Sequence, residues 1–593
     1  LTMNNMYLRI SLITLAFVSP FVSSARENIG DPHHRIQRTE KLSAADCNPA
    51  SSSIDLNINN VRALLQNGGD MWWDLNNTAH YEVPKVEPGS GQTAVSSLFA
   101  GAIWVGGYDA GGQLKIAAQT YRQNGNDYFP GPLDAATGTV DKTVCDEFDH
   151  HWQVFGSEID DFLTQWNNGG GVINPNQIAQ NILNWPAKNN PYNPIAGNRD
   201  LAPFSDVDGN GYYDPTGGDY PVIDPSCGNN YADQMIWWVY NDKGNIHTET
   251  GGEAIGIEVH ALAFSFKTND VLNDMTFYRY SLLNRATSSL DSTFMSQWID
   301  ADLGCYLDDY VGCDTTRGLG IVYNQTAVDG GSGCSADYGD QPPMLGIDYF
   351  KGPKDQNGTE LKMSRFSYYS NDFSPTGNPE VASHYYGYMS GTWKDGTPYT
   401  EGGNGHGGTT PTHFLFPSSP DDPSGWSQCT GGTTGQDPRF MISSGPFRLD
   451  PGASNEIVIG VPWVRPPKGT YPCPKFTLLQ KADDKAQALF DNCFAILEGP
   501  PAPDVEVVEM DKELVLALDN TSEIETYQIK DPTISAQGYA DSLYRFQGYK
   551  IYQVQNSQVT TQELNDASKA RLIAQVDLKD NVTKLINYNY DPI

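Results

Sequence analysis

The sequence has few basic residues for its length. Its 593 residues include 37 Lys and Arg against 72 Asp and Glu, which gives a formal net charge of −35 at pH 7. A nucleic-acid-binding surface needs clustered basic side chains, and an anionic membrane surface repels a chain of this charge. The composition therefore argues against nucleic acid as a partner, whereas its many carboxylates suit divalent cations.

The common catalytic motifs are also absent. The chain has no His-Glu-x-x-His, no Gly-x-Ser-x-Gly and no Gly-x-x-x-x-Gly-Lys-Ser/Thr, and none of its nine cysteines forms Cys-x-x-Cys. These absences argue against zinc peptidases, α/β-hydrolases, P-loop enzymes and thioredoxin-like or zinc-ribbon sites. The odd number of cysteines leaves one thiol over, and the closely spaced Cys305 and Cys313 are the first candidate for a disulfide.

Long apolar runs are missing after the N-terminus. Residues 10–22 are mostly apolar and are followed by Ser23-Ser24-Ala25, which is typical of a signal peptide over residues 1–25. No later run approaches the ~18 apolar residues of a membrane-spanning helix, so we expect no membrane insertion. The chain is predicted to be secreted or held at the cell surface, where disulfides are permitted. Residues 26–53, which are polar and aperiodic, are expected to form a flexible leader.

What the sequence does contain favours a mainly β protein. Aromatic residues make up 11%, with 58 Gly and 38 Pro, and residues 254–266 and 275–283 alternate in polarity with period two. We predict a large β-sandwich-like domain over residues 54–498, with long loops over residues 325–437 and one amphipathic helix over residues 476–494.

A second, smaller module is expected at the C-terminal end. Gly499-Pro500-Pro501-Ala502-Pro503 has the composition of a linker, and strand-like runs follow it. Residues 499–593 are predicted to form an immunoglobulin-like or fibronectin type III-like β-sandwich. The module has no closing pattern, so we expect it to be incomplete and the chain to be part of a longer protein.

The most specific motif is an Asp-x-Asp-x-Asn-Gly-x-x-Asp loop. Its oxygen ligands would come from Asp206, Asp208, Asn210, Tyr212 and Asp214. Calcium takes carboxylate, amide and carbonyl oxygens in this order, with glycine at the sixth position for the sharp turn. An EF-hand is excluded because position twelve carries Gly217 rather than glutamate. The alternative is an Asx/Gly turn that satisfies only its own backbone.

A second acidic cluster follows residues 294–299. It combines Asp300 and Asp302 with Asp308, Asp309 and Asp314. Carboxylates this close repel one another unless they are solvated or neutralised. A second calcium site, with Asp300 and Asp302 as ligands, and a solvated loop are both consistent with the pattern. Two of the carboxylates could also form a glycosidase pair, although acidic loops rich in glycine bind metal more often.

Several runs resemble large secreted, cell-surface proteins of Bacteroidota that are exported by type IX secretion. The matching runs are residues 59–74 (NNVRALLQNGGDMWWD), 117–123 (AAQTYRQ), 206–214 with 218–221 (GDYP), 308–314 (DDYVGCD) and 544–552 (YRFQGYKIY). The last run is similar to the fibronectin-like module of such proteins, and their C-terminal sorting domain is absent here. The resemblance implies a surface location and supplies no catalytic residues.

Two functions remain as hypotheses. The first is a non-enzymatic structural or adhesion protein that calcium stabilises and that contacts other surface proteins. The second is a protein that binds or degrades polysaccharide, with Trp72, Trp73, Trp237 and Trp238 as a candidate sugar platform.

Overall fold

The computed structural model describes most of the chain after residue 44. The described residues are 45–122, 125–433, 437–495, 503–511, 513–519, 524, 526–530, 543–556, 559, 564 and 566–579. The expected signal peptide and residues 26–44 of the expected leader lie outside them. Of the described residues, 34% are in strands and 13% in helices, which confirms the mainly β fold class.

The main body is built on two antiparallel sheets. The first contains ten strands. Its main path runs through β19 (Arg365–Ser370), β20 (Pro438–Leu449), β15 (Leu290–Asp300), β6 (Ala100–Asp109), β3 (Asp70–Met71), β2 (Arg62–Gln66), β4 (Tyr81–Glu82) and β5 (Ser96–Leu98), with β1 (Ser53–Leu56) beside β2 and β7 (Leu114–Ala117) beside β6. Strands β6 and β7 follow one another in the chain and pair antiparallel.

The second sheet also contains ten strands. Its main path runs through β16 (Asp309–Asp314), β17 (Leu319–Asn324), β18 (Met344–Lys351), β21 (Ser454–Val461), β14 (Thr276–Asn284), β13 (Ile257–Ser265), β12 (Gln234–Asn241) and β8 (Phe129–Pro130), with β22 (Trp463–Val464) beside β18 and β9 (Trp152–Phe155) beside β12. The period-two runs predicted as strands are β13 and β14, which pair along their length.

Both sheets are covered on both faces. Between them lies an apolar core in which the indole N–H of Trp72, directly after β3 of the first sheet, donates to the Tyr278 hydroxyl of β14 at 2.9 Å. Helix α4 (Ala382–Ser390) packs on the outer face of the first sheet, where Tyr385 contacts Trp104 with ring centroids 4.9 Å apart. Burial on both faces explains why β12 and β13 are buried at every residue rather than at alternate ones.

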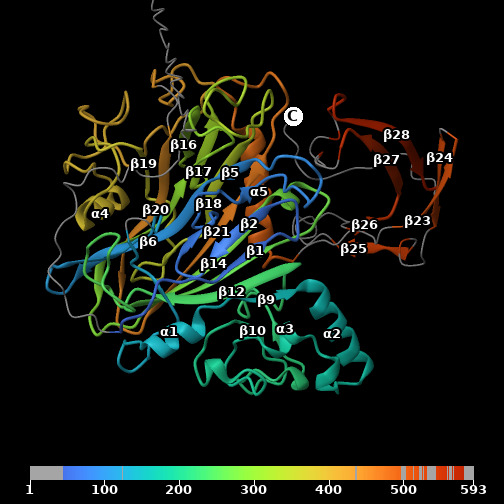
Figure 1. Ribbon diagram of the computed structural model, residues 1–593, viewed down its shortest axis with the longest axis horizontal. Helices are drawn as coiled ribbons and strands as arrows, with labels where there is room; N and C mark the ends of the chain where they lie inside the picture. The colour runs from blue at the N-terminus through green and yellow to red at the C-terminus, as the bar shows by residue number, and fades with distance from the viewer. Residues whose placement is uncertain are drawn as a thin grey trace, which may run out of the picture.

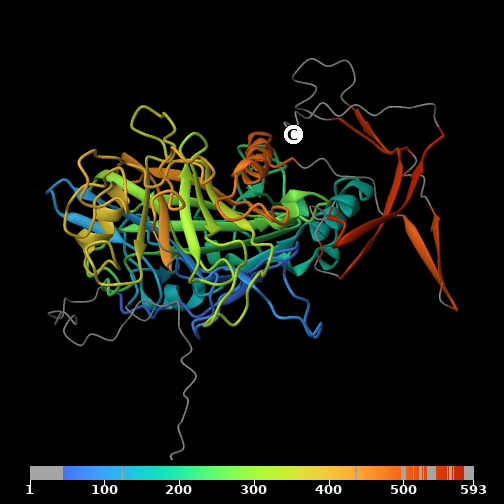
Figure 2. The ribbon, with the colours of Figure 1, turned by 90° about the horizontal axis from the view of Figure 1, so that it is seen from above.

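The outer face of the second sheet carries a second core. Helix α5 (Thr477–Asp491) covers one part of it, and an insertion between β8 and β12 covers another (Figures 1 and 2). That insertion contains α1 (Lys142–Phe148), β9, α2 (Gly156–Asn168), α3 (Gln180–Leu183), β10 (Phe204–Ser205) and β11 (Tyr220–Pro221), with the 3₁₀ turns η2 (Pro175–Gln177), η3 (Pro194–Ala196) and η4 (Pro215–Gly217). A further turn, η5 (Val271–Asp274), precedes β14. The predicted helix over residues 476–494 is α5.

The C-terminal part contains three two-stranded antiparallel pairs, which lie to one side of the main body (Figure 1). They are β23 (Asp504–Met510) with β24 (Glu513–Asp519), β25 (Gln528–Lys530) with β26 (Leu543–Arg545), and β27 (Gly548–Val554) with β28 (Ala570–Asp577). The fibronectin-like module stays a prediction. Among the described residues no helix is long and apolar enough to cross a bilayer.

Three sequence-based expectations need correction. The leader is shorter than predicted, because the Cys47–Cys145 disulfide and the start of β1 at Ser53 fix residues 45–53. The guessed Cys305–Cys313 bridge is wrong, since Cys305 pairs with Cys334 and Cys313 is buried within β16 as the one free thiol. The other two disulfides are Cys227–Cys493 and Cys429–Cys473.

The third correction concerns residues 325–437, which were expected to be surface loops. They contain β18, β19 and α4, and β18 is an inner strand of the second sheet. The surrounding glycine, proline and serine content masked these elements in the sequence.

Candidate metal centres and a polar cleft

The predicted calcium loop lies on the surface between β10 and η4. Asp206 and Asp208 are exposed, whereas Asp219, just before β11, is fully buried beneath the loop. One carboxylate oxygen from each of these three residues lies within 4.8 Å of the other two. Asp219 was not among the predicted ligands, because it lies outside the nine-residue motif. It comes close to Asp206 and Asp208 only where the chain turns into β11.

Asp219 organises the loop through its hydrogen bonds. Its Oδ1 accepts from the Val207 backbone N–H and its Oδ2 from that of Asp214, both at 2.8 Å. Burial raises the pKa of Asp219 to about 6, with the carboxylates of Asp206 and Asp208 adding to the rise and the two amides opposing it. A cation among the three carboxylates would relieve that repulsion.

The other predicted ligands have local hydrogen-bond partners. Asn210 Oδ1 accepts from the backbone N–H of Tyr212 at 2.7 Å, and the Tyr212 side chain is 48% exposed. Asp214 caps η4, accepting from the Thr216 backbone N–H at 3.0 Å and its hydroxyl at 2.6 Å. The loop therefore contains both a group of three carboxylates that could hold calcium and Asx-type turns in which side chains bond only to the backbone of the loop.

The second predicted site is brought together at the ends of two paired strands. Asp300 is the last residue of β15, and Asp302 follows it. Their carboxylate oxygens lie within 4.8 Å of each other and of Asp437, which immediately precedes β20. We call these three residues the strand-end cluster. No local pattern could have revealed Asp437, because only the β15–β20 pairing brings it close.

Arginine neutralises part of this cluster. Arg439 is fully buried and lies opposite Asp300 in the strand pairing, with Nε 3.2 Å from Asp300 Oδ1. Its Nη1 also pairs with Asp437, which accepts a further hydrogen bond from Asn371 Nδ2 at 2.9 Å. The Tyr121 hydroxyl donates to Asp300. Asp300 and Asp437 thus each have Arg439 as a cationic partner.

Asp302 is not satisfied in this way. Its side chain is 8% exposed, and its buried Oδ1 accepts no hydrogen bond among the described residues. Burial raises the pKa of Asp302 well above its ordinary value, the charges of Asp300 and Asp437 add to the rise, and Arg439 only partly opposes it. One guanidinium faces three carboxylates here, so the site needs a proton or a cation to be neutral.

The proposed aromatic sugar platform is excluded by burial. Trp72, Trp73, Trp237 and Trp238 are each 1% exposed. Trp237 belongs to the outer core and Trp238 to the core between the sheets, as expected for neighbours on one strand. None of the four presents a ring face to a ligand.

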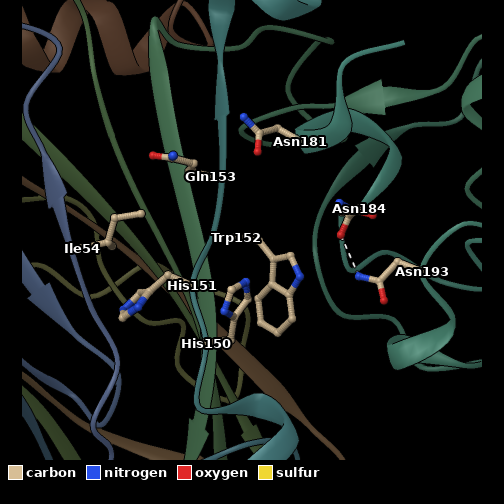
Figure 3. Close-up of a pocket in the computed structure, with 8 residues that line it drawn as sticks. All are labelled: Ile54, His150, His151, Trp152, Gln153, Asn181, Asn184 and Asn193. Carbon is tan, nitrogen blue, oxygen red and sulfur yellow. Dashed lines mark hydrogen bonds between the residues drawn. The ribbon is translucent and has the colours of Figure 1, made fainter. Parts of the chain in front are cut away.

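A different cavity lies where β9 faces the inserted helices, with a volume of about 420 Å³ (Figure 3). Its walls contain aromatic and amide side chains and no charged residue. They are Ile54, His150, His151, Trp152, Gln153, Asn181, Asn184 and Asn193. In Figure 3 the Trp152 ring lies between β9 and the segment carrying Asn184 and Asn193.

Part of the hydrogen-bonding capacity of this cleft is already used. Asn193 Nδ2 donates to the Asn184 backbone oxygen at 2.7 Å, and Asn181 Nδ2 donates to Glu158 at 3.0 Å. The His150 and Trp152 rings pack edge to face with centroids 4.8 Å apart. Without an Asp or Glu in its walls, the cleft offers no acid–base pair for glycoside hydrolysis.

Comparison with known proteins gave no match, either among family models or among curated sequences.

Proposed function

We propose that this chain is a secreted or cell-surface protein without a catalytic role, which binds calcium to stabilise its fold and serves adhesion or cell-envelope architecture. The observation that carries the proposal is the Asp302 carboxylate, which is buried beside two other carboxylates with an oxygen that accepts no hydrogen bond in the described structure. Calcium is the cation that best matches such a site, because it takes six to eight oxygen ligands in irregular geometry.

Charge supports the proposal. The strand-end cluster retains two uncompensated negative charges when all three carboxylates ionise, and a divalent ion cancels both. The loop around Asp206 and Asp208 supplies a second group of three carboxylates, one of which is buried. With a net charge of −35, bound cations also reduce repulsion across the whole molecule.

The extracellular location supports the choice of calcium. Four disulfides tie the main body together, and disulfides persist in oxidising compartments. The resemblance to type IX-exported proteins of Bacteroidota and the fibronectin-like module belong to the same proposal.

Thermal unfolding with calcium and with chelator tests the proposal. A ligand at about 100 times its Kd stabilises by about 2.7 kcal/mol, which corresponds to a rise in Tm of roughly 3 °C for a domain of this size. We expect Asp302→Asn to remove much of that rise and, in chelator, to unfold at a higher temperature than the unaltered chain, because it deletes an unpaired charge. An unaltered chain whose Tm is the same in calcium and chelator would contradict the proposal.

A second candidate function is binding of neutral polysaccharide in the cleft beside β9. The observation that favours it is the lining of the cavity, which has amide and aromatic side chains and no Asp, Glu, Lys or Arg although the protein is strongly acidic. The hydroxyl groups of a sugar form hydrogen bonds with such amides. A glycan array probed with the unaltered chain and with Asn184→Ala tests it. Binding that Asn184→Ala weakens supports this function, and an array without binding removes it.

A further inference from the structure

Arg365, the first residue of β19, is a half-buried cation without a carboxylate partner among the described residues. Burial lowers the pKa of Arg365, and the groups that oppose this effect are two tyrosines, Tyr399 and Tyr386. Other arginines of the main body pair with carboxylates, among them Arg62, Arg122, Arg279, Arg285, Arg317 and Arg439. Because a partly desolvated cation without a counter-ion is unfavourable, this position favours an external anion.

Backbone oxygens hold the Arg365 guanidinium in one orientation. Its Nε donates to the Ser390 backbone oxygen at 2.8 Å and its Nη1 to that of Ser364 at 2.7 Å. Ser390 ends α4, and the carbonyl groups at a helix C-terminus attract a cation without cancelling its charge. The Arg365 Cζ lies 5.6 Å from the centroid of the Phe294 ring. Nη2 donates no hydrogen bond among the described residues and is open to solvent, so the fixed guanidinium keeps one edge for a ligand.

A second nitrogen donor lies beside this guanidinium. Gly391 follows α4 with φ +105°, and a Cβ there would lie 3.0 Å from Arg365 Nε and 3.9 Å from His413 Nδ1. The two side chains therefore come together on one side of Gly391. His413 is exposed, and burial together with the charge of Arg365 lowers its pKa. At pH 7 its ring is therefore mostly neutral and still donates one N–H.

Two tyrosines border the same surface, where α4 packs against β19 and β20 (Figure 1). Tyr386 of α4 packs edge to face on Phe294 with ring centroids 6.0 Å apart, and Tyr108 of β6 packs edge to face on Tyr386 at 5.1 Å. The Tyr108 side chain is 37% exposed. An exposed tyrosine offers an apolar ring and a polar hydroxyl together, which suits the mixed surface of a sugar.

We propose that Arg365, His413 and Tyr108 bind a sugar that carries a carboxylate, that is, a uronic acid. The planar guanidinium matches the geometry of a carboxylate, and the tyrosine ring lies beside it to contact the sugar. The net charge of −35 repels long polyanions, so the expected ligand is an isolated acidic sugar in a glycan rather than a run of them.

This site goes beyond the proposed function and does not depend on calcium. Arg365 pairs with Ser443 at one end of the β19–β20 ladder, whereas Ser370 pairs with Pro438 at the other end, next to Asp437 of the strand-end cluster. The proposed anion site and the strand-end cluster therefore lie at opposite ends of β19. Loss of calcium binding would leave this proposal intact, and loss of sugar binding would leave calcium stabilisation intact.

Ligand-observed NMR titration of the full chain with glucuronate tests the proposal. Chelator is present throughout, so that calcium cannot bridge the sugar to an acidic cluster. We expect glucuronate to bind and glucose not to bind. Arg365→Met should weaken glucuronate binding on the order of tenfold or more, because a charge-assisted hydrogen bond is lost. Arg448→Met, which alters an exposed arginine of β20 paired with Asp291 and Asp450, is the matched control and should keep the affinity.

Two exposed positions provide a second test, where folding is less at risk. Tyr108→Ala and His413→Ala should each weaken glucuronate binding several-fold. No binding to the unaltered chain, or unchanged affinity in folded Arg365→Met and in both exposed variants, would overturn the site. Acetate that binds as tightly as glucuronate would reject the sugar and leave an acidic peptide as the ligand class. Loss of glucuronate binding in Asn184→Ala would move the ligand to the cleft beside β9 and also overturn the proposal.

Discussion

Two buried carboxyl groups between α5 and β18 give the main body a pH-dependent stability. Asp483 of α5 and Asp348 of β18 are 2% and 1% exposed, and they lie close enough to share a hydrogen bond. Burial raises the pKa of Asp348 well above its ordinary value, and burial followed by the charge of Asp484 raises that of Asp483 to about 7. At neutral pH the pair holds at least one proton.

The sign of the effect follows from that direction. A carboxyl whose pKa is higher in the folded state than in the unfolded chain stabilises the fold below the unfolded value and loses this contribution as pH rises through the folded value. For Asp483 this loss of stability takes place between pH 3.8, the ordinary pKa of the group, and about pH 7, its pKa in the folded protein. One pKa unit corresponds to about 1.4 kcal/mol, so ionising Asp483 costs the fold about 4 kcal/mol above pH 7.

Replacing Asp483 by asparagine removes this cost. Asp483→Asn should match the unaltered chain within about 1 kcal/mol at pH 5 and exceed it by up to about 4 kcal/mol at pH 9. Urea unfolding followed by tryptophan fluorescence from pH 5 to 9 measures the difference. Asp491→Asn, at an exposed position of the same helix, is the control and should change the stability little over this range.

The refuting result is a constant difference between Asp483→Asn and the unaltered chain from pH 5 to 9. Because both proteins share every other titrating group, only the Asp348–Asp483 pair can make that difference vary with pH. A constant offset would mean that Asp483 is equally protonated in both states over this range.

Three further predictions follow from other buried groups. Both ring nitrogens of His247 face backbone oxygens, at 2.8 Å from Ile116 and 2.6 Å from Asp242, and therefore both carry a proton. Burial lowers the pKa of His247, but the negative charges of Asp127 and Asp242 outweigh burial and leave that pKa raised. His247→Gln should therefore cost about 3–5 kcal/mol at pH 6 and less as pH rises through that raised pKa, as measured by urea unfolding. A Cβ on Gly101 would lie 2.4 Å from the Trp72 ring, so Gly101→Ala should destabilise by about 1–3 kcal/mol while Gly331→Ala, which meets nothing within 4 Å, should not. Glu258 is fully buried, and His260 and Arg285 bring its pKa to about 2 against the effect of burial. Its stabilisation should persist above pH 4.5 and be lost as pH falls toward 2, and Arg285→Met should weaken that acid dependence in the same assay, because His260 remains.

Periodicity predicted the elements of this fold better than composition did. The alternation in residues 254–266 and 275–283 identified β13 and β14, and the apolar spacing of residues 476–494 identified α5. Composition failed over residues 325–437, because β18 and β19 are short buried strands between glycine- and proline-rich loops. Asp483 on the apolar face of α5 could not be explained from the sequence, because its partner Asp348 comes from a distant strand.

The candidate sites were also only partly predictable from the sequence, because some of their residues come from distant parts of the chain. Asp206, Asp208, Asp300 and Asp302 were predicted because ligands close in sequence leave a local pattern. Asp437 enters its cluster through strand pairing, and Asp219 enters the other where the chain returns into β11, and such contacts leave no trace in a single sequence. Arg439 matters equally, because it decides how much negative charge the strand-end cluster keeps.

The buried carboxylates of this protein separate by the number of oxygens around them, and that number determines what neutralises each one. Asp348 and Asp483 form a pair packed between a helix and a strand, and two carboxyl groups can be neutralised by sharing protons. Asp300, Asp302 and Asp437 form a group of three that faces one guanidinium, so a single shared proton leaves one negative charge in place, whereas a divalent ion would cancel both remaining charges. Calcium should therefore leave the pH dependence contributed by Asp483 intact while it stabilises the strand-end cluster. Titrating calcium into Asp483→Asn at pH 9 should raise its Tm by the same amount as in the unaltered chain, because the Asp348–Asp483 pair lies on the second sheet and the strand-end cluster lies on the first.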